Sequence, residues 1–570
     1  MAPTSKTAPR KQPAKKAAAK KTTPAKKATP AKKAPAPAVA VRAPAVAPAP
    51  VSPTTSPTPT AAPSRRWTPL TIVLVVAVIL GIGLVGRLGS QERGGPPHTF
   101  AALRNGAPAT LYVPGSLDDD DQFPLAPPLG QRPPVVIVAH GFSADQQIMS
   151  TISRSLAKAG FAVIAIDFRG HGSNTKSFGG DLHSDIEAAL DYADRSPYVD
   201  RNRIALLGHS MGASAVLESA SLDARVKAVI PVSGGDVIDD AQVPANVLLI
   251  AGEKDPASIR HRQVDMERQL TGKTNVKRVV VSGKDHVTIL FSGTVMRETV
   301  AWLNTAFGRS PGAPGKIVDP RLGTSLLYML VALVLLFGVG VGAGRLAPVI
   351  GRPQGTGREG ARGLLTVAIA LLVAMPLLAL GSPANFLPIL TGADQYGYYA
   401  VAGLLLFAAR RFGVRRLAEG PSWLPDNLRA TAGVAGLALV SVYVLLLPIS
   451  AIFHRLVPTP ERMVIWAVGT LLMAPLFLAS ESLIRKGSLR SAIGLGAASR
   501  VMSLLVLAIG IRLGFLPGVL SLIMPILLLI FVMVEIFAAG VYWRSRNVWL
   551  IALVEAAWIA WLAAIAGPVI

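Results

Sequence analysis

The sequence predicts an α/β domain with a mostly parallel sheet, placed between one N-terminal transmembrane helix and a C-terminal all-α bundle of about eight transmembrane helices. Residues 134–310 alternate short apolar β-rich runs with helix-length stretches, the pattern of a parallel sheet that helices cover on both faces. Long apolar runs flank this region on both sides, and about 20 such residues cross a hydrocarbon core. Of 570 residues, 51% are hydrophobic and none is cysteine. This composition excludes a mainly disordered protein, disulfides and a thiol nucleophile.

The formal net charge of +24 is unevenly distributed along the chain. Residues 1–66 hold 14 Lys and Arg and no acidic residue, residues 67–320 hold 24 basic and 25 acidic residues, and residues 321–570 hold 19 basic and 8 acidic residues. A strongly basic chain suggests nucleic acid or an anionic membrane as a partner. Because the middle third is neutral, the charge here belongs to the flanks.

Residues 1–66 form a tail rich in Lys, Ala and Pro. With almost no large apolar residue to bury, and with like charges that repel, this tail is expected to be disordered. We interpret it as a solvated cytoplasmic arm that fixes membrane orientation. The alternatives are contact with anionic lipid headgroups or with nucleic acid.

Residues 67–89 are expected to form a transmembrane signal-anchor helix, since Leu70–Gly86 carries no charge. Arg65 and Arg66 precede it, which places the N-terminal side in the cytoplasm. No small-residue cleavage site follows, so we expect the helix to be retained. Residues 90–133 are a Pro/Gly-rich linker that includes the start of the next domain.

We assign the α/β domain to residues 134–310 because this region contains six apolar, β-rich segments. Turn-forming or helix-length segments separate them. These strand candidates are Val135–His140, Ala162–Asp167, Arg203–Leu207, Ala228–Val232, Val247–Ala251 and Val276–Val281.

After a linker at 311–321, residues 322–570 are predicted to form a multi-pass membrane domain. Its candidate spans are 322–343, 363–381, 396–412, 430–452, 463–483, 493–513, 517–541 and 547–567. Together with the anchor this makes nine crossings. The loops predicted to be cytoplasmic hold 14 of the 19 basic residues in this region. By the positive-inside rule, the α/β domain is therefore expected on the extracytoplasmic side of a cell membrane.

The motif Gly208-His209-Ser210-Met211-Gly212 follows a predicted strand and precedes a helical run. A G-x-S-x-G sequence requires this strand–turn–helix setting, in which a strained turn lifts the serine hydroxyl above the edge of the sheet. Ser210 is therefore the candidate nucleophile.

A serine nucleophile needs a base and a carboxylate that orients the base. His286 follows the last strand candidate, and Asp255 follows the strand before it. The chain order Ser210, Asp255, His286 is the order of a hydrolase whose nucleophile sits on such a turn. Asp236, after the preceding strand, is the alternative acid.

The backbone N–H groups of Phe142 and Met211 are the candidate oxyanion hole, because one follows the first strand candidate and the other follows the nucleophile. We interpret His140 and His209 as structural or cleft-lining rather than as bases, and His171 as a residue that caps a loop over the site.

On these residues, together with Asp167-Phe168-Arg169-Gly170-His171-Gly172, residues 134–307 resemble the α/β-hydrolase superfamily, particularly its dienelactone-hydrolase-like and prolyl-oligopeptidase-like branches. The resemblance implies an acyl-enzyme mechanism on Ser210, Asp255 and His286, with no cofactor and no metal. Many relatives insert a lid before the acid-bearing strand, but Val232 and Val247 are too close in sequence for one. We therefore expect an open cleft.

The sequence thus predicts a membrane-anchored serine hydrolase that cleaves an acyl ester, of a lipid-like or smaller kind. A peptidase or an acyltransferase on the same triad is the alternative, and a transporter or sensor whose α/β domain only binds ligand is the competing class. Within the predicted spans, Glu535 and Glu555 are candidate partners of Arg500, either as a structural ion pair or as functional groups, since unpaired charges are expensive in lipid.

Overall fold

The computed structural model describes residues 68–114, 128–179, 181–236, 244–310, 319–349, 355–378, 380–390, 392–412, 427–516, 518 and 520–570. The basic tail at 1–66 and most of the linker at 311–321 lie outside the described residues.

Eight strands form one sheet in the order β1-β2-β4-β3-β5-β6-β7-β8. The strands are β1 (His98–Ala102), β2 (Pro108–Tyr112), β3 (Pro134–Ala139), β4 (Ala162–Ile166), β5 (Asp200–His209), β6 (Val226–Val232), β7 (Asn246–Gly252) and β8 (Asn275–Val281). β2 is antiparallel to both β1 and β4, and the other neighbours pair in parallel. The six expected strands are confirmed. β1 and β2 extend the sheet into residues 90–133, where the sequence analysis named no strand.

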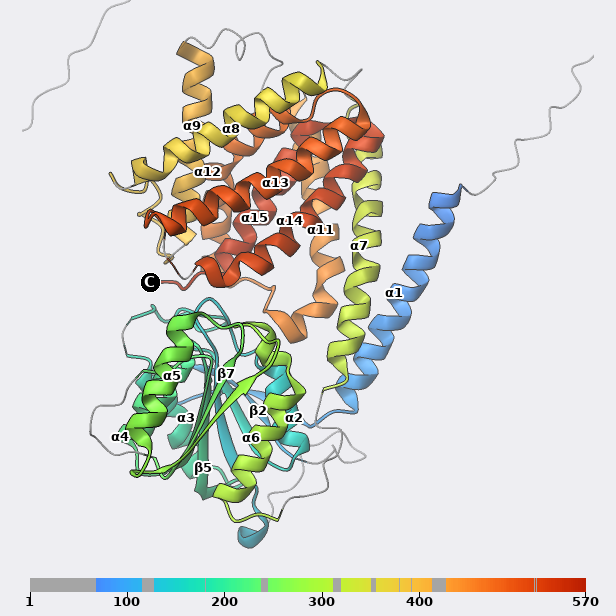
Figure 1. Cartoon of the computed structure of the whole chain (residues 1–570). Helices are drawn as coiled ribbons and strands as arrows, with labels where there is room; N and C mark the ends of the chain where they lie inside the picture. The colour runs from blue at the N-terminus through green and yellow to red at the C-terminus, as the bar shows by residue number, and fades with distance from the viewer. Residues whose placement is uncertain are drawn as a thin grey trace, which may run out of the picture. The chain divides into compact units, whose positions relative to one another are not determined.

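Helices cover both faces of this sheet (Figure 1). One face packs against α2 (Ser150–Lys158) and α6 (Gly293–Ala306), and the other against α3 (His183–Arg195), α4 (Met211–Leu222) and α5 (Ala257–Leu270). The residues of strand β3 are apolar throughout because both faces of the strand are buried. Val136 and Val138 face the first layer and Val135 and Ile137 the second, and all four are fully buried. A parallel sheet buried on both faces requires such a run.

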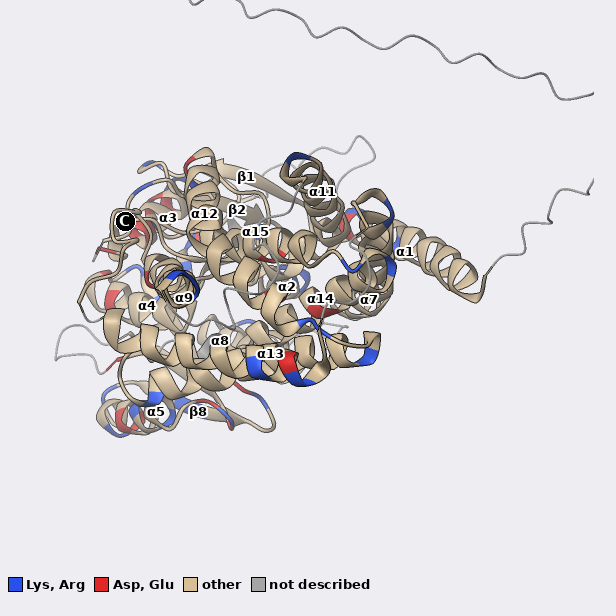
Figure 2. Ribbon diagram, turned by 90° about the horizontal axis from the view of Figure 1, so that it is seen from above, with Lys and Arg blue, Asp and Glu red and all other residues tan. Residues whose placement is uncertain are grey.

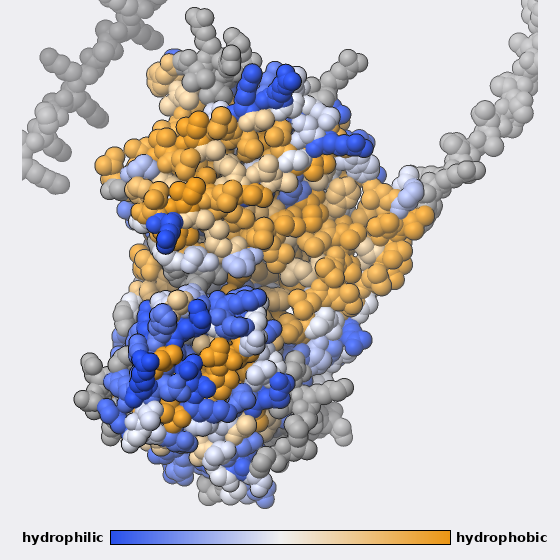
Figure 3. All heavy atoms as spheres, viewed as in Figure 1, coloured by the Kyte–Doolittle hydropathy of each residue, from blue (hydrophilic) through white to orange (hydrophobic). Residues whose placement is uncertain are grey.

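The apolar flanks are helical. The helices are α1 (Pro69–Arg93), α7 (Arg321–Leu346), α8 (Gly357–Leu378), α9 (Gly392–Phe412), α11 (Leu428–Phe453), α12 (Pro460–Ile484), α13 (Leu489–Arg512), α14 (Leu520–Ser545) and α15 (Val548–Ala566). Among the described residues, eight helices are long and apolar enough to cross a membrane. Figure 3 shows apolar side chains over this region and mostly hydrophilic ones over the α/β domain.

Eight of the nine expected crossings coincide with these helices, and the ninth, α9, is helical over the expected residues but is less apolar. Its sequence includes Asp394, Arg410 and Arg411 and has a lower mean apolar character than its neighbours. The helix nevertheless packs along α8 and α12.

Two helices of the bundle approach each other closely through glycine. A Cβ at Gly340 of α7 would lie 2.2 Å from Phe537 O of α14, and a Cβ at Gly540 would lie 2.5 Å from Phe337 O. Only glycine permits this separation of two backbones, as is common where membrane helices pack.

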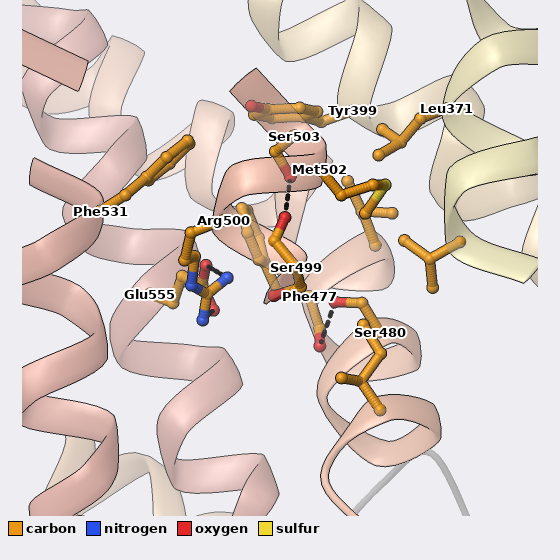
Figure 4. Close-up of a pocket in the computed structure, with 13 residues that line it drawn as sticks. Leu371, Tyr399, Phe477, Ser480, Ser499, Arg500, Met502, Ser503, Phe531 and Glu555 are labelled. Carbon is orange, nitrogen blue, oxygen red and sulfur yellow. Dashed lines mark hydrogen bonds and ion pairs between the residues drawn. The ribbon is translucent and has the colours of Figure 1, made fainter. Parts of the chain in front are cut away.

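Five charged residues inside the bundle form one network. Arg500 binds Glu555 and Glu481 and lies 3.6 Å from Glu535, while Arg485 binds Glu481 and Glu535. Figure 4 shows the Arg500 guanidinium against Glu555, beside a small cavity lined by Tyr399, Ser480 and Ser503. The expected pairing of Arg500 with Glu535 and Glu555 is confirmed, and Arg485 and Glu481 extend it.

Candidate active site

Ser210 lies at the turn between β5 and α4 with φ 55° and ψ −116°, a left-handed conformation that non-glycine residues seldom adopt. The glycines on either side make this turn possible. A Cβ at Gly208 would lie 2.1 Å from Gly212 O, and a Cβ at Gly212 would lie 2.5 Å from His140 O. The G-x-S-x-G spacing thus reflects the close contact of the turn with itself and with the end of β3.

The structure brings Ser210, His286 and Asp255 together from three loops at the carboxyl edge of the sheet. His286 Nε2 lies 2.9 Å from Ser210 Oγ, and His286 Nδ1 lies 2.9 Å from Asp255 Oδ1. His286 and Asp255 are buried, whereas Ser210 is half-buried. A hydroxyl, an imidazole and a carboxylate in this line can deliver an activated oxygen to a carbonyl carbon.

Asp255 is held as a carboxylate. Burial opposes its ionisation, but hydrogen bonds from His286, Ser233 and the Gly252 amide outweigh burial and keep the pKa of Asp255 below its ordinary value. Ser233 Oγ donates to Asp255 Oδ2 at 2.6 Å, and Gly252 N donates to the same oxygen at 2.7 Å. The two donors to Oδ2 therefore fix the carboxylate, and this keeps Oδ1 directed at His286.

Ser233 is a residue of the site that the sequence analysis missed. It follows β6 and has φ 48°. A signal was present, since the segment Val232-Ser233-Gly234-Gly235 ends a predicted strand with a small hydroxyl residue and two glycines. The sequence does not show that this hydroxyl reaches a carboxylate 22 residues later.

The two other nearby aspartates lie away from His286. The Asp236 carboxylate is exposed and binds Arg262 at 2.6 Å and Ser214 Oγ at 3.2 Å. Asp285, next to His286 in sequence, accepts hydrogen bonds from the amides of Val287 and Thr288. The geometry favours Asp255 over Asp236 as the partner of His286.

The candidate oxyanion groups lie beside Ser210. A Cβ at Gly141 would lie 3.1 Å from Ser210 Cβ, so the backbone that precedes Phe142 passes close to the nucleophile. Met211 is the first residue of α4. Neither the Phe142 nor the Met211 amide donates a hydrogen bond to another residue in the described part of the chain. Both N–H groups are thus available to a substrate oxygen.

Three further histidines lie near the site and are neutral. Burial lowers the pKa of His140 to about 4 and those of His171 and His209 to about 3. His140 Nε2 accepts from the Phe168 amide, and His209 Nε2 lies 2.8 Å from His286 O. These contacts are structural, as the sequence analysis expected of His140 and His209.

Comparison with known proteins agrees with this geometry. Residues 127–307 match the family model described as PETase: PET hydrolase-like. These residues are an α/β-hydrolase domain. The chain is 29% identical over 180 residues to cutinase est2 of Thermobifida alba, covering 30% of this chain and 58% of that protein. It is 32% identical over 173 residues to bis(hydroxyethyl) terephthalate hydrolase of Streptomyces coelicolor, covering 28% and 54%.

A solved α/β serine hydrolase without a lid, from Xanthomonas campestris, is 19% identical, with a TM-score of 0.30 over 39% of this chain and 97% of that one. The chain spans only about half the length of the two curated relatives named above. The family model covers residues 127–307 and includes none of the long apolar helices named above.

Proposed function

We propose that this protein is a membrane-anchored serine hydrolase that cleaves acyl esters through Ser210, His286 and Asp255. The observation that carries the proposal is the continuous chain of contacts from Ser210 Oγ to His286 and on to Asp255, with Ser210 on a strained turn. Both relatives named above carry the name of an ester hydrolase, which supports an ester as the bond that is cleaved.

In the proposed mechanism, Ser210 Oγ attacks the ester carbonyl carbon while its proton passes to His286 Nε2. The Phe142 and Met211 N–H groups bind the oxygen that becomes negatively charged, and loss of one such donor typically raises the barrier by about 2.7–4 kcal/mol. As the tetrahedral intermediate collapses, the ester C–O bond breaks and the leaving alcohol takes the proton from His286. Water then attacks the acyl-enzyme, with its proton accepted by His286 and passed to Ser210 Oγ as the acid leaves.

Activity-based labelling tests the proposal. The full chain in detergent is expected to react with a fluorophosphonate probe and to hydrolyse p-nitrophenyl acetate, and Ser210→Ala should abolish both. Ser214→Ala, one turn further along α4, is the matched control and should retain both. A folded wild-type protein that neither labels nor hydrolyses any ester would favour the competing class, a transporter or sensor whose α/β domain only binds ligand.

We further propose that the α/β domain lies on the extracytoplasmic side. The helix ends that contact it include the start of α7 and the end of α11. The opposite ends of helices carry Arg345, Arg410, Arg411 and Arg429, and Figure 2 looks onto this end, with basic residues at α9, α11 and α13. Because basic loops stay in the cytoplasm, this end is assigned to the inside.

Reporter fusions test this orientation. Alkaline phosphatase fused after residue 310 should be active, and the same reporter fused after Leu346 should be inactive. The reverse pattern would place the α/β domain in the cytoplasm.

A further inference from the structure

The loop that carries Phe142 is bound to the membrane helices. The buried Asp145 accepts a hydrogen bond through Oδ2 from the Arg455 amide at 2.7 Å and lies 3.1 Å from His454 Nδ1. Ser150 Oγ donates to Ala451 O at 2.9 Å. These partners belong to the end of α11 and the residues that follow it, so the segment between α11 and α12 lies against the loop that follows β3.

The loop that follows β4 is bound at a second place. Gly170 O accepts from Val569 N at 2.9 Å, and Phe178 N donates to Val569 O at 2.6 Å. The guanidinium of Arg462, almost fully buried at the start of α12, donates to Gly170 O at 2.6 Å and to Gly567 O at 2.7 Å. It also donates to Ala564 O at 2.6 Å. One charged side chain thus joins the carboxyl end of α15, where a cation is favourable, to the hydrolase loop.

This second contact reaches the active site through aromatic rings. Phe142 packs edge-to-face on Phe178 and on His171, with ring centroids 5.9 Å apart in each pair. Phe142 follows Gly141, which lies against Ser210. The segment that holds Val569 is therefore linked to the oxyanion side of the site through Phe178 and Phe142.

Apolar side chains remain exposed beside this contact. Ile389 and Val569 pair as an antiparallel bridge, and Ile570 N donates to Pro388 O. The neighbours Phe386 and Ile570 are 68% and 48% exposed. They lie next to the ends of α8, α9 and α15, the ends assigned to the outer membrane surface. We call the exposed Phe386, Leu390 and Ile570, together with the buried Leu387, Ile389 and Val569, the junction wall.

We propose that the junction wall is the acyl-chain subsite of this hydrolase, and that it selects esters with a long, lipid-like acyl group at the membrane surface. Arg462 acts as a positioning residue that holds the wall against Phe178. The proposal rests on the proposed function. Three observations favour an acyl chain as the occupant of this subsite. Its apolar side chains are exposed, they lie beside the ends of membrane helices, and Val569 is linked to Phe142 through Phe178.

The experiment compares two esters with the full chain reconstituted in vesicles of phosphatidylethanolamine and phosphatidylglycerol. We measure kcat/KM for p-nitrophenyl palmitate and for p-nitrophenyl acetate and take their ratio. Ile570→Ser and Phe386→Ser each remove an apolar contact with the chain and should lower the ratio by about tenfold. Arg462→Gln should lower it at least as much, and Arg462→Lys, which keeps the charge, should restore part of it.

Phe100→Ser is the matched control, because Phe100 is an equally exposed phenylalanine on the edge strand β1 and should leave the ratio unchanged. If Arg462→Gln fails to fold, the two exposed substitutions still decide the outcome. A protein that labels with fluorophosphonate and cleaves both esters, but whose ratio no junction-wall variant changes, would overturn the subsite. Failure of the wild-type protein to label or to cleave acetate would instead contradict the proposed function.

Discussion

Asp255 shows how one carboxylate is fixed by donors that do not take part in proton transfer. Oδ2 is saturated by Ser233 and the Gly252 amide, which leaves Oδ1 to His286. Asp255→Asn should retain the packing but turn the His286 ring or favour its wrong tautomer, and we expect kcat to fall by about 10³- to 10⁴-fold. Esterase kinetics check this. Asp236→Asn, on the exposed neighbour, should change kcat by less than twofold, and the opposite ranking would reassign the acid.

Ser233 gives a finer test at the same scale. Ser233→Ala removes one of the two donors to Asp255 Oδ2 and leaves that oxygen with the Gly252 amide alone. Because the hydrogen bonds of Asp255 hold its pKa down, the variant should raise that pKa and lower kcat severalfold, since the carboxylate then holds His286 less firmly. An unchanged kcat would show that Ser233 does not support the site.

At the residue scale, the motif and the strand order sufficed to predict Ser210, Asp255 and His286 as neighbours. Each follows a strand whose carboxyl end meets the same edge of a parallel sheet. Ser233 and Arg462 could not be predicted in the same way. Their roles depend on contacts between segments far apart in the chain, and neither has a motif that fixes its partner.

At the scale of elements, a strand or helix could be predicted where its sequence is a continuous apolar run of the right length. The buried central strands are continuous apolar runs, whereas β1 is mostly exposed and β2 begins with a proline, so neither has that signal. The helix α9 was predicted as a span from its apolar centre, although Asp394, Arg410 and Arg411 near its ends lower its hydropathy.

Loss of a single member of the buried charge network should destabilise the bundle. Arg485 is fully buried and binds both Glu481 and Glu535. Arg485→Met would leave these carboxylates with fewer partners in a medium of low polarity, and removal of one partner from such a pair typically costs about 3–5 kcal/mol. We expect a clear drop in the thermal midpoint of the detergent-solubilised protein. Arg490→Met, exposed at the start of α13, is the control and should have little effect.

For the whole molecule, the two regions are joined by charged contacts on both sides of the α/β domain. On the side of α2, Arg154 binds Glu92 of α1, and Arg321 of α7 donates to Ser150 Oγ at 3.4 Å. On the side of the active site, the Arg462 guanidinium donates to Gly170 O, and the Asp145 carboxylate accepts from the Arg455 amide. A domain that is tethered at both ends keeps its catalytic edge against the helix ends, which is the arrangement that the acyl-chain subsite requires.

The stability of the α/β domain should fall below neutral pH because of its buried histidines. His140, His171 and His209 have folded pKa values of about 3 to 4, below the ordinary 6.5, so the unfolded chain binds more protons in this range. Their contribution is complete above about pH 6.5 and is lost as the pH falls toward 4, by up to roughly 3 kcal/mol for each group. Asp167, with a pKa raised by burial to about 6, works in the opposite direction but is a single group.

Hydrogen exchange of the β3 and β5 amides, measured between pH 7 and pH 4.5 and corrected for the intrinsic exchange rate, checks this prediction. Protection should decrease steadily as the pH falls. His171→Phe, which keeps a ring against Phe142 and Phe178 but removes one titrating group, should make the decrease shallower. His261→Gln, exposed on α5, should leave it unaltered. Protection that is independent of pH over this range would contradict the lowered pKa values of these histidines. It would mean that the imidazoles are accessible to protons in the folded protein and that the polar contacts of His140 and His209 do not depend on the neutral form.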